Sequence, residues 1–460
     1  MVRAAVVGSG PAGVYAAAAL AAGGVDVDVL DRLPAPFGLV RYGVAPDHPK
    51  IKSIAQALRK VLLTPGVRFL GNVDVGTDVT IEELREHYAV VLIAVGAAVD
   101  RRLGVPGEDL PGSASATRFV AWYNGHPDVP PDAFTLDAPA VAVVGLGNVA
   151  LDVARMLARS PDDLARTDLP EHVLRAFEAS RVTDIHIVGR RGPAQAKFTT
   201  KELREFGEVP GVDILVDPAD LQLDPASRAL VDAEAGVRRN VDVFTEWAAR
   251  TPQGRPRRVH VHFWARPVAV LGTDHVTGLR VERATPDETG RPVGTGVTTD
   301  LDVRQVFRSV GYRGLPVPGL PFDPDTGTVP HQAGRVLAAP GSSQVRPGLY
   351  VAGWIKRGPT GVVGTNKSDA AETVASVLAD LPGLPAPAHD DPDALIDRLT
   401  GRGVPVVTWA GWEAIEAAEA AAGAACGRGT VKIADRATLL SVAAAVRAEA
   451  GAGAGAVPGP

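Results

Sequence analysis

Two glycine-rich turns are the features of this sequence whose residue types and spacing most directly suggest chemistry. The first reads Gly8-Ser9-Gly10-Pro11-Ala12-Gly13, and the second reads Gly145-Leu146-Gly147-Asn148-Val149-Ala150. In the G-x-G-x-x-G/A pattern, the first glycine allows a tight turn and the second lets the backbone approach a pyrophosphate. The third position lets the following helix pack close to the strand, with its N-terminus facing the phosphates. Each turn therefore predicts a dinucleotide site.

The residues at the ends of the second strands distinguish the two sites. Asp31 follows the predicted strand 25–30 of the first site. A carboxylate at this position accepts hydrogen bonds from a ribose diol and repels a 2′-phosphate. Arg190 and Arg191 follow the predicted strand 184–188 of the second site, and paired guanidiniums suit the 2′-phosphate of NADP. We therefore expect FAD or NAD at the first site and NADP(H) at the second.

The segment after Asp31 favours FAD over NAD at the first site. Residues 36–43 read PFGLVRYG, an aromatic and glycine-rich loop in place of a plain helix. Such a loop could enclose a bulky ring system. The later strand ends in small residues at 94–97, which could pack against a cofactor.

A strand–turn–helix layout positions each turn, over residues 4–22 and 141–157. The alternation of strands and helices predicts an α/β fold with two Rossmann-like dinucleotide-binding domains around parallel sheets. Gly- and Pro-rich crossing loops at 103–112 and 309–316 indicate that one domain is inserted into the other. The Gly/Ala/Pro-rich tail from about 450 to 460 is predicted to be disordered. Further strands are expected at 25–30, 90–94, 184–188 and 348–353.

The composition narrows the function classes. A net charge of −6 argues against a nucleic-acid binder. We find no secretory leader and no apolar run of about 18 residues, so we expect a cytoplasmic protein without a membrane span. The single cysteine, Cys426, cannot form a redox pair or an iron–sulfur cluster, which argues against a disulfide reductase of the same fold. An NADPH-dependent flavin monooxygenase and a non-catalytic dinucleotide-binding sensor remain alternatives.

Several longer blocks resemble the adrenodoxin-reductase-type ferredoxin–NADP+ reductases, especially the bacterial ones. The resemblance implies an FAD-binding domain made of residues 1–101 and 314–460, with an NADP-binding domain of residues 102–313 inserted between them. It also implies that NADPH delivers a hydride to FAD and that single electrons then pass to an acidic ferredoxin, which can in turn supply a cytochrome P450. The matching blocks are 41–52, 145–152, 189–193, 201–205 and 353–366.

The resemblance also implies roles for individual residues. His48 and Glu205 would form an ion pair in the active site, which we expect to place the nicotinamide without an obligatory proton transfer. The chain departs from the family at Asp31, where close relatives usually have Glu, and we expect the shorter side chain still to reach the ribose. The implied FAD contacts are Leu39, Val75, Trp354, Gly361, Val362 and Val363. The implied NADP contacts are Arg101, Leu146, Gly147, Asn148, Val149, Arg190, Arg191, Glu202 and Gly361.

A group of arginines forms a basic cluster inside this net-acidic chain. Ferredoxins are acidic, so the cluster could steer one by charge, and the resemblance adds Arg204 to the docking face. We predict that Arg204, Arg238 and Arg239 contact the partner, with a solvated basic face as the alternative. The cluster consists of Arg238, Arg239, Arg250, Arg255, Arg257 and Arg258.

Overall fold

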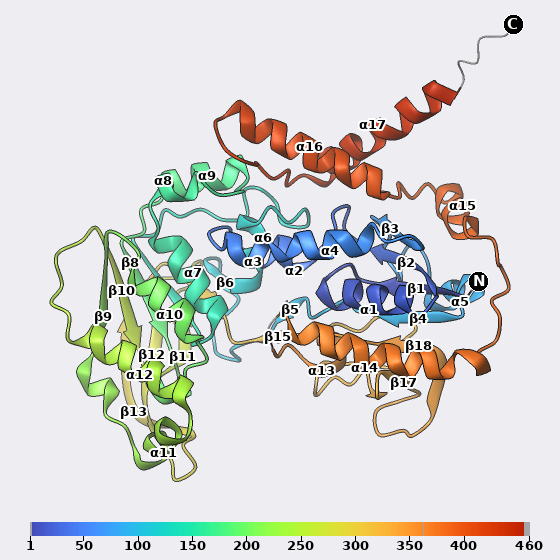
Figure 1. Ribbon diagram of the computed structural model, residues 1–460. Coiled ribbons are helices and arrows are strands. Elements are labelled where there is room, and N and C mark those ends of the chain that lie inside the picture. Colours follow the sequence, from blue (N-terminus) through green and yellow to red (C-terminus); the bar gives the residue numbers. More distant parts are fainter. Residues whose placement is uncertain (1, 362, 455–460) are drawn as a thin grey trace, which may run out of the picture. The chain divides into compact units, whose positions relative to one another are not determined.

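The computed structural model describes residues 2–361 and 363–454 (Figure 1). The chain forms two compact units. Unit 1 comprises Met1–Val99, Asn124–Asp128 and Tyr312–Pro460, and unit 2 comprises Asp100–Tyr123 and Val129–Gly311. Unit 2 is thus inserted into unit 1. The predicted fold class, an α/β protein with one Rossmann-like domain inserted into another, is confirmed.

The chain passes between the two units close to the predicted crossing loops. The first division falls at residues 99–100, ahead of the loop predicted at 103–112, and the last falls at 311–312, within the loop predicted at 309–316. The short segment 124–128 returns to unit 1, although the sequence assigned it to the inserted domain.

A seven-stranded sheet forms the centre of unit 1, in the order β16-β17-β18-β4-β1-β2-β3. Strands β18, β4, β1, β2 and β3 run parallel, whereas β16 and β17 are joined antiparallel. Every residue of β1 and β4 is buried, as expected for parallel strands covered on both faces. The strands are β1 Arg3–Val7, β2 Asp26–Asp31, β3 Val67–Gly71, β4 Val90–Ile93, β16 His331–Gln332, β17 Arg335–Leu337 and β18 Val345–Val351.

The alternation of side chains along β1 divides the core of unit 1 into two layers. Ala4 and Val6 belong to a cluster with residues of α1, α4, α14 and α16. Ala5 and Val7 belong to a second cluster with residues of α5 and α15. The helices of unit 1 are α1 Pro11–Ala22, α2 Leu39–Tyr42, α3 Pro49–Lys52, α4 Ile54–Leu62, α5 Ile81–His87, α13 Trp354–Arg357, α14 Thr365–Asp380, α15 Ala394–Gly401, α16 Trp409–Ala425 and α17 Arg436–Ala454, with a 3-10 turn at Leu381–Gly383.

The chain remains helical beyond the start of the predicted disordered tail. Helix α17 continues to Ala454, four residues past position 450. Alanine, the strongest helix former, alternates with glycine over residues 451–454. The rest of the predicted tail, 455–460, lies outside the described residues.

Unit 2 contains a parallel sheet in the order β6-β14-β7-β8-β10-β9 and an antiparallel sheet in the order β11-β12-β13. The predicted strands at 141–144 and 184–188 correspond to β7 and β8. The strands of unit 2 are β6 Ser113–Ser115, β7 Ala140–Val144, β8 Asp184–Val188, β9 Val212–Val216, β10 Arg257–His262, β11 Ala265–Leu271, β12 Gly278–Pro286, β13 Pro292–Leu301 and β14 Gln305–Arg308.

The helices of unit 2 accompany its parallel sheet. Helix α7 follows the second glycine turn directly, as the sequence predicts. The helices are α6 Ala116–Tyr123, α7 Asn148–Ala158, α8 Pro161–Leu164, α9 Glu171–Glu178, α10 Thr200–Gly207, α11 Pro225–Ala233 and α12 Ala235–Ala248, with 3-10 turns at Pro193–Gln195 and Pro218–Leu221. Among the helices described in either unit, none has the length and apolar character that a membrane crossing needs.

Candidate dinucleotide-binding sites

The first glycine turn joins β1 to α1 and is closed on the protein side. Gly8 has φ +110°, and a Cβ there would lie 2.5 Å from the carbonyl oxygen of Ala94. A Cβ on Gly13 would lie 1.8 Å from the carbonyl oxygen of Gly8. At Gly10, no heavy atom lies within 4 Å of the position that a Cβ would take. The turn therefore has open space at the glycine through which a pyrophosphate approaches the backbone.

Asp31 ends β2 beside this turn. Its Oδ2 accepts hydrogen bonds from the backbone N–H of Ser9 at 2.8 Å and from the Ser9 hydroxyl at 2.5 Å. Its Oδ1 accepts from the N–H of Leu33 at 2.9 Å. Burial raises the pKa of Asp31 above its ordinary value, and the bonds from Ser9 and Leu33 oppose that rise. Asp31 therefore holds the glycine turn against the end of β2.

Two other segments of unit 1 converge on the same turn. The loop before α2 contacts it, since the N–H of Phe37 donates to the carbonyl of Ser9 at 3.1 Å. A Cβ on Gly38 would lie 3.0 Å from the Cα of Gly10. A Cβ on Gly353, at the start of α13, would lie 2.6 Å from the Cβ of Ala12. The structure therefore brings the predicted aromatic loop and the C-terminal glycine segment to the first turn.

The other predicted FAD contacts also belong to unit 1. Trp354 is half-buried, its ring centroid is 5.3 Å from that of Tyr312, and its Nε1 donates to the carbonyl of Thr360 at 3.2 Å. Leu39 begins α2 and is 39% exposed, so an apolar side chain is available for contact. Gly361 adopts φ +81°, and Val75 and Val363 are half-buried. Val362 lies outside the described residues.

The second glycine turn, between β7 and α7, repeats this geometry in unit 2. Gly145 has φ +145°, and a Cβ there would lie 2.2 Å from the carbonyl oxygen of Ser309. At Gly147 no heavy atom lies within 4 Å of the Cβ position. Ala150 replaces the third glycine and is fully buried. Two open glycine turns thus occur in one chain.

The neighbouring segments hold the second turn in place. A Cβ on Gly189, after β8, would lie 2.2 Å from the side chain of Leu146. The N–H of Lys197 donates to the carbonyl of Leu146 at 2.7 Å. The Oδ1 of Asn148 accepts from the N–H of Thr199 at 2.9 Å. Leu146 and Asn148 are therefore bonded to the segment that leads into α10.

Arg190 and Arg191 are both exposed at the end of β8. In the part of the chain that the structure describes, neither guanidinium has a hydrogen-bond or ion-pair partner. Their backbone is nevertheless held, since the N–H of Trp264 donates to the carbonyl of Arg191 at 3.0 Å. Arg101 is exposed as well, and its N–H donates to the carbonyl of Gly311 at 2.8 Å. The two charges at 190 and 191 are thus available to an anion.

The predicted residues of α10 differ in their surroundings. Glu202 is buried, and its Oε2 lies 3.7 Å from a guanidinium nitrogen of Arg155 on α7. Glu205 is exposed and lies 3.8 Å from the ammonium of Lys201 one turn earlier. Arg204 is exposed. Glu202 therefore links α10 to the helix that follows the second turn, whereas Arg204 and Glu205 face solvent.

His48 lies in unit 1 at the start of α3. It is half-buried, its N–H donates to the carbonyl of Ala45 at 3.0 Å, and its own carbonyl accepts from the N–H groups of Ile51 and Lys52. Its expected partner Glu205 belongs to unit 2, so their pairing stays a prediction.

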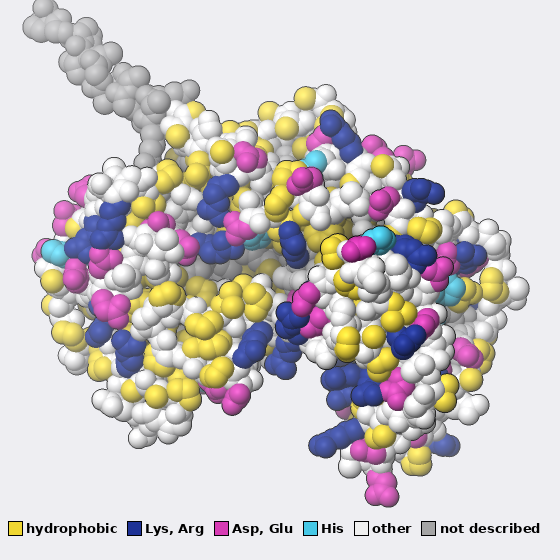
Figure 2. Space-filling model, turned by 180° about the vertical axis from the view of Figure 1, so that it is seen from behind, with side chains coloured by type: hydrophobic (Ala, Val, Ile, Leu, Met, Phe, Trp, Pro, Cys, Tyr) yellow, Lys and Arg dark blue, Asp and Glu magenta, His cyan; other side chains and the backbone are white. Residues whose placement is uncertain are grey.

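Most arginines of the basic cluster already have partners inside unit 2. Arg258 binds both carboxylate oxygens of Asp184, at 2.8 and 2.6 Å. Arg204 and Arg239 are exposed and lack a side-chain partner among the described residues. Figure 2 shows basic side chains interspersed with acidic ones on the face that it draws. The engaged members are Arg238 with the carbonyls of Val231 and Asp232, Arg250 with that of Gly207, Arg255 with the carboxylate of Asp213, and Arg257 with the carbonyl of Ala158.

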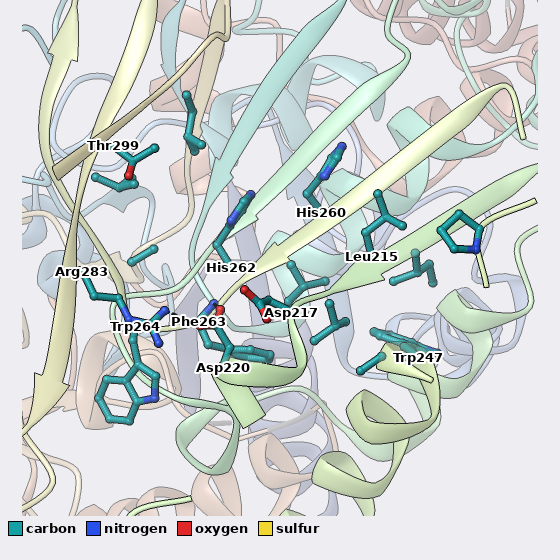
Figure 3. A pocket seen from close by; sticks show the side chains of 18 of the residues that line it. Leu215, Asp217, Asp220, Trp247, His260, His262, Phe263, Trp264, Arg283 and Thr299 are labelled. Atoms are coloured by element: carbon teal, nitrogen blue, oxygen red, sulfur yellow. Dashed lines mark hydrogen bonds and ion pairs between the residues drawn. The ribbon is translucent and has the colours of Figure 1, made fainter. Parts of the chain in front are cut away.

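Unit 2 also contains a cavity of about 560 Å³ that the sequence did not predict. Figure 3 shows His260 and His262 projecting from β10 toward it. His260 bonds to Asp184 at 2.9 Å, and His262 bonds to His186 at 3.0 Å. Burial lowers the pKa of His262 to about 4, so this ring is neutral at neutral pH. Of the basic cluster, Arg250 lines this cavity, whereas the predicted cofactor-binding residues do not. The spacing His-x-His on one strand is the signal that could have indicated it.

Comparison with known proteins identifies relatives over nearly the whole chain. The model of the pyridine nucleotide-disulphide oxidoreductase family matches residues 2–217. NADPH-ferredoxin reductase FprA of Mycobacterium tuberculosis is 44% identical, with 95% of this chain and 98% of that protein covered. The mitochondrial NADPH:adrenodoxin oxidoreductase of Arabidopsis thaliana is 40% identical, with 95% of each covered. The solved structure of M. tuberculosis FprA in complex with NADPH superimposes with a TM-score of 0.90 at 43% identity, covering 96% and 99% of the two chains.

Proposed function

This chain belongs to the adrenodoxin-reductase-type NADPH-ferredoxin reductases, and from that membership we propose which of its residues hold each cofactor and guide the electrons. The protein is an oxidoreductase that takes electrons from NADPH and delivers them to a ferredoxin. FAD, when bound, supplies chemistry that no side chain offers, since it accepts a hydride and returns electrons singly.

We assign FAD to unit 1. The open position at Gly10 and the N-terminus of α1 would receive the pyrophosphate. Asp31, already an acceptor for Ser9, would also accept from the ribose. Trp354 and Leu39 would contact the ring system and exclude water from it, because both present apolar surface beside the turn. The remaining proposed contacts are Val75, Gly361, Val362 and Val363.

We assign NADP(H) to unit 2. The open position at Gly147 and the N-terminus of α7 would receive the pyrophosphate. Arg190 and Arg191 would bind the 2′-phosphate, since guanidiniums match phosphate oxygens in pairs. Glu202 would act by holding α10 against α7. Arg101, Leu146, Asn148 and Val149 complete the proposed contacts.

We propose that His48 and Glu205 pair to orient the nicotinamide. A carboxylate beside an imidazole favours the charged form of the ring and orients it. This pair is a positioning device, because hydride transfer itself needs no protein acid or base.

We propose an acidic ferredoxin as the electron acceptor, with a cytochrome P450 as a consumer of its electrons. Arg204 and Arg239 are the members of the proposed docking face whose charges the rest of the described chain does not use. The guanidinium of Arg238 donates to two carbonyls of α11. Its positive charge therefore remains, but these hydrogen bonds fix its position.

The observation that carries this proposal is the contrast between two open glycine turns. One lies beside a carboxylate, and the other lies beside two guanidiniums that have no partner among the described residues. The test is an anaerobic titration of the purified yellow protein with NADPH, followed by addition of ferredoxins from the same cell. We expect the flavin absorbance to bleach with NADPH, to bleach more slowly with NADH, and to return when a ferredoxin is added. A protein that binds both dinucleotides without bleaching would be a sensor, and coupled hydroxylation of an organic substrate with oxygen would identify a monooxygenase.

A further inference from the structure

Glu86, His87 and His389 bring one carboxylate and two imidazoles together in unit 1. One ligand atom from each residue lies within 4.8 Å of the other two. Glu86 and His87 end α5, and His389 lies in the irregular segment before α15. The rings of His87 and His389 have centroids 4.8 Å apart and planes 31° apart. Imidazole nitrogens and carboxylate oxygens are the donors that zinc binds in proteins.

His87 supplies the second observation that points to a ligand. The residue is 1% exposed. Neither of its ring nitrogens has a hydrogen-bond partner within the described chain. A buried imidazole without partners has lost its bonds to water without replacement, which is unfavourable. A metal ion bound to one ring nitrogen would remove part of that penalty.

The backbone holds His389 beside α5 although its side chain is exposed. The N–H of His389 donates to the carbonyl of Glu86 at 2.9 Å. The guanidinium of Arg3 donates to the carbonyls of Asp391 and Pro392, two and three residues after His389, at 3.1 and 2.9 Å. Segments from distant parts of the chain therefore meet here, and a bound ion would draw together ligand atoms that already lie within 4.8 Å of one another.

Arg398 is the main local competitor for a cation. It extends from α15, and its guanidinium lies 3.0 Å from one carboxylate oxygen of Glu86. Glu86 is about half exposed and has a second oxygen, so it can bind a metal ion while it keeps this contact. The repulsion between the arginine and a divalent ion lowers the affinity of the site.

We propose that Glu86, His87 and His389 bind a divalent transition-metal ion of the zinc type, with water as the fourth ligand. The ion holds the segment before α15 against α5. The site lies away from the glycine turn, because α5 precedes β4 at the amino edge of the sheet, whereas the glycine turn leaves the sheet at its carboxyl edge.

The test is calorimetric titration of the full-length, FAD-loaded, EDTA-treated protein with ZnCl2. We expect one equivalent to bind. H389A and H87A should each weaken binding by at least about tenfold, the scale seen even for residues that only support a metal ligand. E86Q should also weaken it. R398Q should bind more tightly, since a competing cation has been removed. H275A, an exposed histidine of unit 2, is the matched control and should bind as the native protein does.

Thermal unfolding provides a second readout. Zinc should raise the unfolding temperature of the native protein and of H275A but not of H389A, while NADPH-dependent ferricyanide reduction stays unchanged. His389 is exposed, so H389A decides the question even if H87A fails to fold. The proposal is overturned if no equivalent of zinc binds, or if binding survives in H389A.

Discussion

At the scale of single residues, Asp31 differs from Arg190 and Arg191 in whether its charged group has hydrogen-bond partners within the chain. Asp31 accepts hydrogen bonds from Ser9 and Leu33, so its carboxylate is partly committed to the turn. Arg190 and Arg191 have no such partners in the described part of the chain. Asp31 therefore shapes its site through bonds within the chain, whereas the proposed role of Arg190 and Arg191 is to bind the ligand.

We predict that the double variant R190A/R191A distinguishes the two pyridine nucleotides. Each lost charge-assisted hydrogen bond costs about 1.5–3 kcal/mol, so the loss of both should raise KM for NADPH by about a hundredfold or more. KM for NADH, which lacks the 2′-phosphate, should change little. The measurement is ferricyanide reduction with each donor. R175A, an exposed arginine of α9 in the same unit, is the control. An equal loss with both donors would contradict the assignment.

The histidine at position 48 should tune the rate without being essential. In H48Q the nicotinamide loses part of its positioning, so we expect hydride transfer to slow by about tenfold or less in stopped-flow bleaching. E205Q should act in the same direction, and E208Q, exposed near the same helix end, should not. A loss of about 10⁴ in H48Q, typical of a removed acid–base catalyst, would show that positioning is the wrong role.

At the scale of elements, α16 holds the loop that precedes and includes α2. Arg41 binds Glu419 at 2.5 Å, and their side chains are only 9% and 2% exposed. The guanidinium of Arg41 also lies 5.0 Å from the ring centroid of Trp412. Glu419 accepts from the N–H of Ile433 at 2.8 Å as well. A C-terminal helix thus stabilises a loop near the first glycine turn.

We predict that E419A destabilises unit 1 and loosens FAD. Removal of one partner of a buried ion pair leaves the other charge buried, which costs about 3–5 kcal/mol. Helix α16 contains its own control, because Glu413 pairs with Arg59 at an exposed position, where such a pair contributes about 0–1 kcal/mol. Urea unfolding and the FAD retained after gel filtration should therefore change in E419A and hardly change in E413A. Similar behaviour of both variants would contradict this role for α16.

Elements that adjoin the glycine turns could be predicted from sequence, and β13 could not. Strands β1, β7 and β8 are short apolar runs next to a turn, and their local pattern suffices. Most residues of β13 are exposed, so the strand has no apolar alternation. Its place in the antiparallel sheet depends on pairing with β12, which no local pattern of β13 shows.

At the scale of the whole molecule, half-buried histidines in both units predict acid sensitivity. Burial lowers the pKa of His126 in unit 1 and of His262 in unit 2 to about 4 each. Because these values lie below the ordinary value of about 6.5, the unfolded chain binds the protons first. Their stabilising contribution is complete above about pH 6.5 and is lost as the pH falls toward 4.

The free energy of unfolding should therefore decrease between pH 6.5 and 4.5 by up to about 1.4 kcal/mol per pH unit for each histidine. Urea unfolding at pH 7.5, 6.0 and 5.0 measures this slope, and H126Q should reduce it. Carboxylates such as Glu83, whose bond with Arg402 lowers its pKa to about 2, contribute only below about pH 4.5. A stability that is flat from pH 7 to pH 5 would be inconsistent with these shifts.

Charge on the docking face acts over distances comparable to the whole molecule. We predict that R204E/R239E weakens ferredoxin reduction and flattens its dependence on salt, because steering by opposite charges has been reversed. Ferricyanide reduction should be unchanged. R175E/R181E, at two exposed positions of the same unit, lowers the net charge by the same amount and is the control for a simple change in net charge. Equal losses with ferredoxin and with ferricyanide would exclude a docking role for Arg204 and Arg239.

The sequence by itself determined the two glycine turns, the strands and helices beside them, and the contrast between Asp31 and the two arginines. These features depend on steric and charge effects within a few residues, so they can be read locally. Only the tertiary structure decided which arginines keep an unused charge, since Arg258 meets Asp184 and Arg41 meets Glu419 from distant parts of the chain. It also decided that His87 is buried beside His389. Burial and ion pairing depend on segments that folding brings together, and no local pattern records which of them will meet.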